Sequence, residues 1–580
     1  MEKDKLLEYV KECYDESKSG FQSLLSEVYT DNSYYVGDQW LDSDLEEAKR
    51  RKLPTLSLNL VKKQVDTVSG LERQNKADIK VFPIESGDDI VSEVLTQTVK
   101  WVTSSRSMVN AKSEAYKESL IGGLSWLSVE MDYSRDFIEG DIVVAKDSVF
   151  NLLPDPQMTK MDLSDCSYLV RHKKMPKRKL KNLYPKFKKE IDSLSAGDFN
   201  DGVRHETNVS DDKKKNLTVV ELWYKETVEK TFVINTNDVS DSSEWKGDED
   251  RLVMMIQANP HYTPIKRNME VLKLAIVIEN KTIVFDGINP MGLDMFPFIP
   301  IPAYYTQASD DWGKKLQGLV RPLRDIQNEK NKRRTSILQA TGTMAHSGWI
   351  IDKGAVDDVS KLRNAGGRAV IIEKNIGRGM TPIAPPNLPN GLVQLEQLFD
   401  NDARQIGLSP DMIGQLHSSN DSGKSIQLRQ KQGLSALMEV SDNLSYATRH
   451  LGNIIVSIIL KKFSNEKIQR ILGDKIQVPE NFDQSRESVR YDIHIDEIAN
   501  SPTHKMQMFE QLMQAQQYGI QVPIESLVNY MEMPVTEKQK MLEQIEQQKQ
   551  QAQMMQQQQM EQQNQQAIQQ QMVKQGGMNG

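Results

Sequence analysis

The sequence has few cysteines, no long apolar run and no excess of positive charge. Only two cysteines, Cys13 and Cys166, occur among 580 residues, too few for a disulfide scaffold or a cysteine-based zinc site. The longest proline-free apolar run, residues 451–460, is far shorter than the roughly 20 residues that cross a bilayer. The first 18 residues are charged throughout, unlike a signal peptide. We expect a soluble, non-secreted chain in a reducing compartment.

The balance of charge excludes one further class. Lys and Arg number 73 and Asp and Glu number 81, a net charge of -8, which argues against a protein coated with basic residues for general nucleic-acid binding. A local or sliding contact with DNA stays open. At roughly 150 residues per domain, the length predicts about four domains or layers.

No catalytic constellation emerges from the motifs. The eight histidines are scattered, and none forms a His-x-x-x-His pair with a nearby Glu. The string Ser418–Ser425 (SSNDSGKS) approaches a phosphate loop, but Ser418 replaces the first glycine and no buried strand precedes it. We favour a mobile loop capped by Ser425 and predict no enzyme activity, no cofactor and no metal site.

Periodicity predicts a mixed α+β chain. Helices are expected over residues 1–30, with an interruption at Gly20, and over 42–52, 60–73 and 91–120. Strands are expected over 79–83, 126–133, 142–145, 219–224, 231–234, 271–278 and 282–285. Residues 235–250 are acidic and are expected to be mobile. Residues 296–302 contain three prolines and are expected to be extended.

The pattern changes after residue 312. A basic helix is expected from about Pro322, within a segment 314–334 that holds eight Lys or Arg. A small β-α-β unit follows, with strands at 348–352 and 368–373 and a helix at 355–363, and then an extended proline-rich segment at 381–390. A helix over 391–406, a polar loop over 407–423 and a helix of nearly forty residues over 425–463 come next. Residues 539–575 hold 19 Gln and favour either a helix in an assembled state or a disordered tail.

The basic helix has two interpretations. It either faces phosphates or a partner, or is a solvated helix face, which is the commoner case. The same choice applies to Lys361, Arg363 and Arg368 in the β-α-β unit. The aromatic residues Tyr34, Tyr35 and Trp40 are expected to pack in a turn or the core rather than to stack on bases.

The order of these segments resembles that of a bacteriophage portal protein, the head-to-tail connector of tailed phages, and is most similar to the type of short-tailed phages (podoviruses). Four stretches carry the resemblance over some 400 residues: YYVGDQW at 34–40 with RRKLPTLSLN and VSGLERQNKADIKVFP; SLIGGLSWLSVEMDY at 119–133 with VFNLLPDP; FPFIPIP with GLVRPLRDIQNEKNKRRTSI at 318–337; and IGLSPDMIG at 406–414. No single string is as specific as a metal motif, so the resemblance rests on their order.

The resemblance implies a multi-domain portal fold that is mainly helical around a DNA channel and forms a ring, usually of twelve subunits. The implied parts are a wing (1–310), a first stem helix (311–340), a clip (341–390), a second stem helix (391–406), a tunnel loop (407–424), a long wing helix (425–463), a crown (464–533) and a Gln-rich C-terminal helix or barrel (534–580).

The resemblance also implies site residues and partners. Candidates for the DNA channel are Gln415, His417, Ser419, Asn420 and Lys424 in the tunnel loop, and Arg324, Lys330, Arg333 and Arg334 in the stem. Lys361, Arg363 and Arg368 are candidates for docking at the clip. The implied partners are other copies of the chain, the terminase large subunit, tail adaptor proteins, the major capsid and scaffolding proteins, and double-stranded DNA bound without sequence specificity, but no membrane. The implied location is the capsid vertex of the virion, after assembly in the host cytoplasm.

Two other hypotheses remain open. The first is an ATPase that uses the loop Ser418–Ser425. The second is a helical scaffold or adaptor protein of the virion that assembles through its Gln-rich tail.

Overall fold

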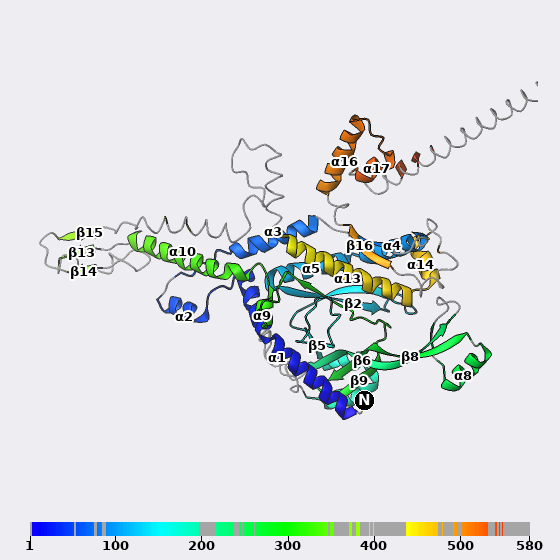
Figure 1. Ribbon diagram of the computed structural model, residues 1–580. Helices are drawn as coiled ribbons and strands as arrows, with labels where there is room; N and C mark the ends of the chain where they lie inside the picture. Colours follow the sequence, from blue (N-terminus) through cyan, green and yellow to red (C-terminus); the bar gives the residue numbers. More distant parts are fainter. Residues whose placement is uncertain are drawn as a thin grey trace, which may run out of the picture. The chain divides into compact units, whose positions relative to one another are not determined.

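The computed structural model describes residues 3–51, 54–74, 78–83, 89–195, 216–236, 243–245, 247–259, 261–345, 349–352, 371–373, 379–382, 437–473, 491–496 and 502–531, with isolated positions at 394, 398, 478, 540–541, 544–545 and 548. These residues are mixed helix and strand, as the sequence predicts (Figure 1). The chain divides into two compact units. The first comprises 1–71 and 79–494, and the second comprises 72–78 and 495–580.

The first helix, α1 (Lys3–Val36), is longer than predicted. The expected interruption at Gly20 is wrong, because the helix continues through this residue. A side chain at Gly20 would place its Cβ 2.6 Å from the ring of Pro156, so the glycine allows the loop before β5 to approach α1. The helix ends at Gly37, whose φ of +98° suits glycine. Tyr34 and Tyr35 therefore belong to its last turn.

Four further helices follow α1 among the described residues, and the last of them packs against a small sheet. They are α2 (Asp42–Arg51), α3 (Leu60–Gln74), α4 (Asp89–Thr103) and α5 (Arg106–Gly122). The prediction of a single helix over 91–120 is wrong, because the helical conformation is interrupted at Ser104 and Ser105. Ser105 is extended (φ −60°, ψ 133°), and the Ser104 hydroxyl donates to the Trp101 carbonyl. Serine side chains compete in this way for backbone partners and favour helix ends.

The small sheet has the order β10-β2-β3. Its strands are β2 (Leu124–Asp132), β3 (Asp141–Asp147) and β10 (Phe298–Pro302), and both pairings are antiparallel. The predicted extended segment with prolines therefore pairs as an edge strand, where a missing donor is tolerated. Trp126, at 0% exposure, lies in the centre of the core that this sheet shares with α5.

A larger antiparallel sheet has the order β4-β5-β6-β8-β9, with β7 beside β6. Its strands are β4 (Leu152–Pro154), β5 (Tyr168–Pro176), β6 (Asn216–Asn235), β7 (Ser243–Glu244), β8 (Tyr262–Ile278) and β9 (Thr282–Ile288). The amino-terminal half of α1 packs on one face of this sheet. The helices α6 (Lys177–Leu183) and α7 (Lys188–Ser193) pack on another apolar cluster.

Two of these strands are longer than predicted. The separate strands expected at 219–224 and 231–234 are one strand, β6, which pairs with β8 over residues 219–235. The mostly polar residues 225–230 between them lack the apolar alternation that would have revealed one strand. β8 likewise begins at Tyr262 rather than at the predicted residue 271. The outer half of β6 carries the helix α8 (Glu249–Ala258), part of which lies in the segment expected to be mobile.

The predicted first stem helix, 311–340, differs from the structure. Residues 312–323 form a short helix α9 (Trp312–Lys315), a bridge strand β12 (Leu316–Gln317) that pairs with β11 (Tyr304–Tyr305), and a 3-10 turn η3 (Arg321–Leu323). The regular helix α10 runs over Arg324–Ala345. The interruption coincides with Gly318. A Cβ at this position would collide with the carbonyl oxygen of Ile121, so the chain can pass close to α5 only with glycine here. The start of the helix just after Pro322 is confirmed.

Only parts of the remaining segments are described. In the predicted clip, β13 (Trp349–Ile351) pairs in parallel with β14 (Ile371–Glu373), as a β-α-β unit requires, and antiparallel with β15 (Met380–Pro382). Of the predicted long helix, α13 (Met438–Lys462) is described and 425–436 lies outside the described residues.

The predicted crown, 464–533, straddles the boundary between the two units. α14 (Asn465–Leu472) packs against α4, and β16 (Tyr491–Asp496) pairs with β1 (Asp78–Pro83). α16 (Pro502–Gln517) and α17 (Ile524–Tyr530) pack against each other in the second unit. Beyond residue 548, the Gln-rich tail lies outside the described residues.

Candidate functional site

The basic helix α10 is anchored to α1 by a buried ionic cluster. Asp31 of α1 is fully buried, and both its carboxylate oxygens are paired. One of them lies 2.6 Å from Nη2 of Arg324 and the other 3.1 Å from Nη2 of Arg321. Glu27, one turn earlier on α1, accepts a hydrogen bond of 2.6 Å from Arg324 Nη1. Helix α1 thus places two acids, at i and i+4, opposite Arg321 of the turn η3 and Arg324, the first residue of α10.

Burial changes the chemistry of this cluster. It raises the pKa of Asp31 to about 6, although both guanidiniums act to lower it. Arg324 is only 15% exposed and its positive charge is balanced by α1. Arg321 also donates to the backbone carbonyls of Gly313 and Leu316. We conclude that these two arginines anchor α10 to α1. The sequence analysis named Arg324 as a channel candidate and did not predict this anchoring contact.

A row of polar side chains continues the anchorage along α10. Gln327, Asn331 and Thr335 follow one another at intervals of four residues and therefore lie on one face. They are 1%, 2% and 9% exposed. Their oxygens accept hydrogen bonds from the backbone N–H groups of Leu60 (2.9 Å), Leu58 (3.0 Å) and Leu56 (3.3 Å), respectively. We call these three side chains and the segment 56–60 the polar seam.

The periods of the two elements explain this match. Four residues of α-helix rise about 6.0 Å, and two residues of extended chain rise about 6.6 Å. Each helical turn can therefore meet every second N–H of an extended segment that runs antiparallel to the helix. The segment 54–59 is not helical, so its N–H groups are not used within a helix.

Further hydrogen bonds close the polar seam on itself. The Gln327 amide donates to the carbonyl of Leu58 (2.7 Å) and to Asn331 Oδ1 (3.0 Å). Asn331 Nδ2 donates to Gln39 Oε1 at 2.6 Å. Buried amides are costly unless they are paired, so this network fixes both the rotation and the position of α10.

The aromatic residues of the sequence motif support the same junction. The Tyr34 hydroxyl donates to Asn328 Oδ1 of α10 at 2.7 Å. Trp40 Nε1 donates to the carbonyl of Leu56 at 3.2 Å, and Tyr35 donates to Asp66 of α3 at 2.8 Å. The prediction that these three side chains pack in the fold is confirmed.

The other predicted stem residues lie elsewhere around the helix. With 3.6 residues per turn, Arg333 lies opposite the polar seam, Lys330 lies to one side and Arg334 flanks it. Arg333 pairs with Glu329 at 2.7 Å on this opposite face. Lys332, on the other side, lies 3.4 Å from Asp44. The structure therefore separates an anchoring face from a basic face on one helix.

The remaining predicted site residues cannot be placed. The tunnel-loop candidates Gln415, His417, Ser419, Asn420 and Lys424 lie outside the described residues. So do the clip candidates Lys361, Arg363 and Arg368, and the loop Ser418–Ser425 of the ATPase hypothesis.

The sequence analysis missed Asp31, Gln327, Asn331 and Thr335. The amide spacing was visible, because Gln327, Asn331 and Thr335 recur every fourth residue in a helix that is otherwise basic. Asp31 carried no such signal, since an acid near a helix end normally faces solvent.

The described part of the chain offers no group of three or more His, Cys, Asp or Glu that could hold a metal ion. Both cysteines are buried and unpaired with one another. None of the described helices is long and apolar enough to cross a membrane.

Comparison with known proteins gives one match. The model of the phage P22-like portal protein family matches residues 10–579, nearly the whole chain. No curated protein matches the sequence.

Proposed function

Because the chain belongs to the phage P22-like portal protein family, we propose that it forms a ring of twelve copies at one vertex of the capsid. Double-stranded DNA passes through the centre of this ring when the genome is packaged and again when it is ejected. The chain acts as a structural channel and docking platform, and the hydrolysis that drives packaging belongs to a separate terminase.

We propose the following parts for this role. Residues 1–310 form the wing, α10 and the segment 391–406 form the two stem helices, and 341–390 form the clip. The segments 407–424, 425–463, 464–533 and 534–580 form the tunnel loop, the long wing helix, the crown and the C-terminal helix or barrel. The clip docks the terminase large subunit and later the tail adaptor proteins through Lys361, Arg363 and Arg368. The wing and crown face capsid and scaffolding proteins.

The two-faced helix α10 carries this proposal. One face is fixed to the wing by Asp31 and the polar seam, and the opposite face carries Arg333. We propose that Lys330 and Arg333 approach the DNA backbone, with Arg334 at the flank and Arg324 as an anchor. A few basic residues in a chain of net charge -8 suit a channel through which DNA must slide, because each neutralised phosphate adds salt-dependent affinity.

The tunnel loop supplies the second proposed contact with DNA. Gln415, His417, Ser419, Asn420 and Lys424 can touch phosphates and sugars without reading bases. Ejection then depends on the same uncharged and weakly basic lining as packaging. The ring assembles in the host cytoplasm and stays in the virion.

Native mass spectrometry and negative-stain images of the purified chain test the ring. We expect closed rings of twelve copies with a central hole. A chain that stays monomeric both alone and with its scaffolding protein contradicts the proposal.

A packaging assay with terminase then tests the basic face. The double variant Lys330→Gln, Arg333→Gln should form normal rings but package less DNA. Lys332→Gln is the matched control, because Lys332 lies on another side of α10 and pairs with Asp44. Equal packaging by all three proteins would remove the basic face from the proposal.

A further inference from the structure

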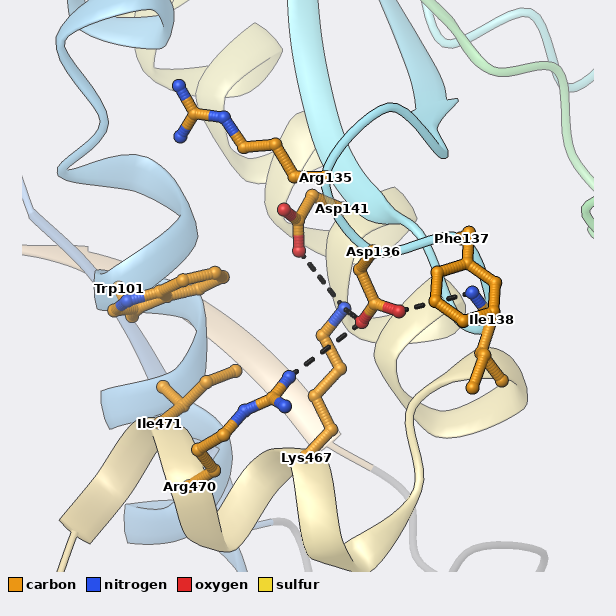
Figure 2. A pocket seen from close by; sticks show the side chains of 9 residues that line it. All are labelled: Trp101, Arg135, Asp136, Phe137, Ile138, Asp141, Lys467, Arg470 and Ile471. Carbon is orange, nitrogen blue, oxygen red and sulfur yellow. Dashed lines mark hydrogen bonds and ion pairs between the residues drawn. The ribbon is translucent and has the colours of Figure 1, made fainter.

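The turn between β2 and β3 exposes its most apolar side chains. Phe137 is 82% exposed and Ile138 is 74% exposed. Trp101, at the end of α4, is 45% exposed nearby, and Figure 2 shows all three around one pocket. Exposed aromatic and aliphatic side chains that gather at one place indicate a surface for a partner.

This turn is held rigidly although its tip is exposed. Lys467 of α14 is 3% exposed, and its ammonium lies 3.0 Å from both Asp136 and Asp141 and also donates to the carbonyl of Gly140. Glu139 accepts a hydrogen bond of 2.7 Å from the Ser464 hydroxyl. A pre-organised surface loses little conformational entropy when it binds, so Phe137 and Ile138 form a fixed projection.

The pocket beside the projection combines apolar walls with positive charge. Its volume is about 550 Å³, and Trp101, Phe137, Ile138 and Ile471 supply its apolar surface. Arg135 and Arg470 supply guanidiniums, and Arg470 is 73% exposed and lies 3.7 Å from Asp136. Asp136 and Asp141 also line the pocket, but both are paired with Lys467. A ligand for this pocket should therefore present apolar side chains next to carboxylates.

One element of the same chain has this chemistry. The helix α8 lies at the end of a two-stranded ribbon formed by the outer halves of β6 and β8, which Figure 1 shows leading away from the larger sheet. Val253 and Met254 on α8 are 53% and 68% exposed, and Asp248 and Asp250 at its start are exposed. The short strand β7 pairs with β6 at Phe232 and Val233, and the rest of the arm is a two-stranded ribbon. Such a ribbon is only marginally stable in water, so this arm gains from a partner surface.

We propose that α8 of one copy binds the pocket of Trp101, Phe137 and Arg470 on a second copy. Val253 and Met254 would cover the apolar walls, while Asp248 and Asp250 would pair with Arg135 and Arg470. The donor and the acceptor are different surfaces, so the contact is head-to-tail and can close a ring. This inference rests on the proposed portal function and names a contact that holds the ring together.

Cysteine cross-linking tests the contact directly. The two native cysteines are 2% and 0% exposed and should stay silent. Rings assembled from equal amounts of the single variants Phe137→Cys and Met254→Cys are oxidised with diamide and separated without reductant. We expect at least ten-fold more cross-linked dimer from the mixture than from either variant alone. Rings with no such excess would overturn the contact and leave the portal function intact, whereas a wild-type chain without rings would overturn both.

Charge reversal gives a second, independent measurement. Arg470→Glu should reduce the yield of rings at least ten-fold, and adding Asp250→Lys should restore it. Arg178→Glu is the matched control, because Arg178 is an exposed arginine of α6. Circular dichroism would show that each variant is folded. Normal ring yields for Arg470→Glu, or a double variant no better than the single one, would contradict the proposed pairing.

Discussion

Two clusters in the first unit bury a charge in opposite senses. At the start of α10, a fully buried carboxylate, Asp31, lies between Arg321 and Arg324. At α14, a buried ammonium, Lys467, lies between Asp136 and Asp141. The acid partners of Lys467 are 22% and 29% exposed, whereas the partners of Asp31 are only 15% exposed.

The difference lies in where water can reach. Burial raises the pKa of Asp31 to about 6, while the hydrogen bond from Lys467 lowers the pKa of Asp136 to about 2. A carboxylate that water can reach stays ionised easily. A carboxylate that is buried away from water stays ionised only while its cationic partners are present. The α10 anchorage should therefore be the more sensitive of the two clusters to the loss of one side chain.

Removing a cation from the Asp31 cluster gives the largest expected effect. Arg324→Met leaves the buried Asp31 with Arg321 as its one remaining guanidinium, and we expect the free energy of unfolding to fall by about 3 kcal/mol. Urea titration followed by tryptophan fluorescence measures it. Arg333→Met, on the opposite face, breaks the half-exposed pair with Glu329 and should cost less than about 0.5 kcal/mol. Equal losses for both variants would show that Asp31 does not depend on its partners.

The two clusters should also respond oppositely to pH. The folded-state pKa of Asp31 is about 6 and its ordinary pKa is 3.8. Between these two pH values, Asp31 holds a proton in the folded chain that it has lost in the unfolded chain. The free energy of unfolding should fall by about 2 kcal/mol between about pH 4 and pH 6 on this account, and Asp31→Asn should remove that fall.

Asp136 should act in the other direction. Its folded-state pKa is lowered, so its stabilisation is complete above the ordinary pKa and is lost as the pH falls toward 2. The comparison is made by urea titrations of the wild type, Asp31→Asn and Asp136→Asn over the whole range. Parallel curves for all three proteins would contradict the assignment.

Asn331→Ala asks whether charges alone fix α10. The change leaves the N–H of Leu58 and the amide oxygen of Gln39 without their partner, at a cost of between about 1 and 2 kcal/mol. Urea titration gives the value. Ser336→Ala serves as the control, since Ser336 is exposed on the same helix and its hydroxyl contacts only the backbone of Lys332. If Asn331→Ala leaves the free energy of unfolding unchanged, the ionic cluster of Asp31 alone anchors α10.

Lys467→Met should have the smallest effect of the substitutions proposed for buried residues. Methionine fills the space of the lysine stem, and water can reach Asp136 and Asp141 after the ammonium is lost, so we expect about 1 kcal/mol. Urea titration should show this loss, and hydrogen exchange should show faster opening of the turn around Phe137. A loss as large as that of Arg324→Met would remove the distinction between wet and dry acid partners.

The sequence predicts the elements where apolar spacing is regular. Helix α3 and strand β2 agree closely with their predicted ranges, and six consecutive residues of β2, 124–129, are buried. The prediction fails at Gly20, where a glycine marks a close contact with Pro156 and not a helix end. It also fails at residues 225–230 of β6, which are mostly polar and pair with β8 between the two predicted strands.

The candidate site was predicted only in part. The basic character of α10 and its start after Pro322 follow from the local sequence. The division into an anchoring and a basic face does not, because Asp31 and Arg324 are 293 positions apart. No local pattern shows that a charge on α1 is buried or which distant side chain meets it, and the same holds for Lys467 and Asp136.

The polar seam brings together two structural repeats of slightly different length, so their contacts match only over a short stretch. The helix advances about 6.0 Å per four residues and the extended segment about 6.6 Å per two residues, so the mismatch grows by about 0.6 Å at each step. The three hydrogen bonds lengthen in the same order, from 2.9 Å at Gln327 to 3.0 Å at Asn331 and 3.3 Å at Thr335. The row ends at Leu56 because the next position in the series is Pro54, which has no backbone N–H to donate.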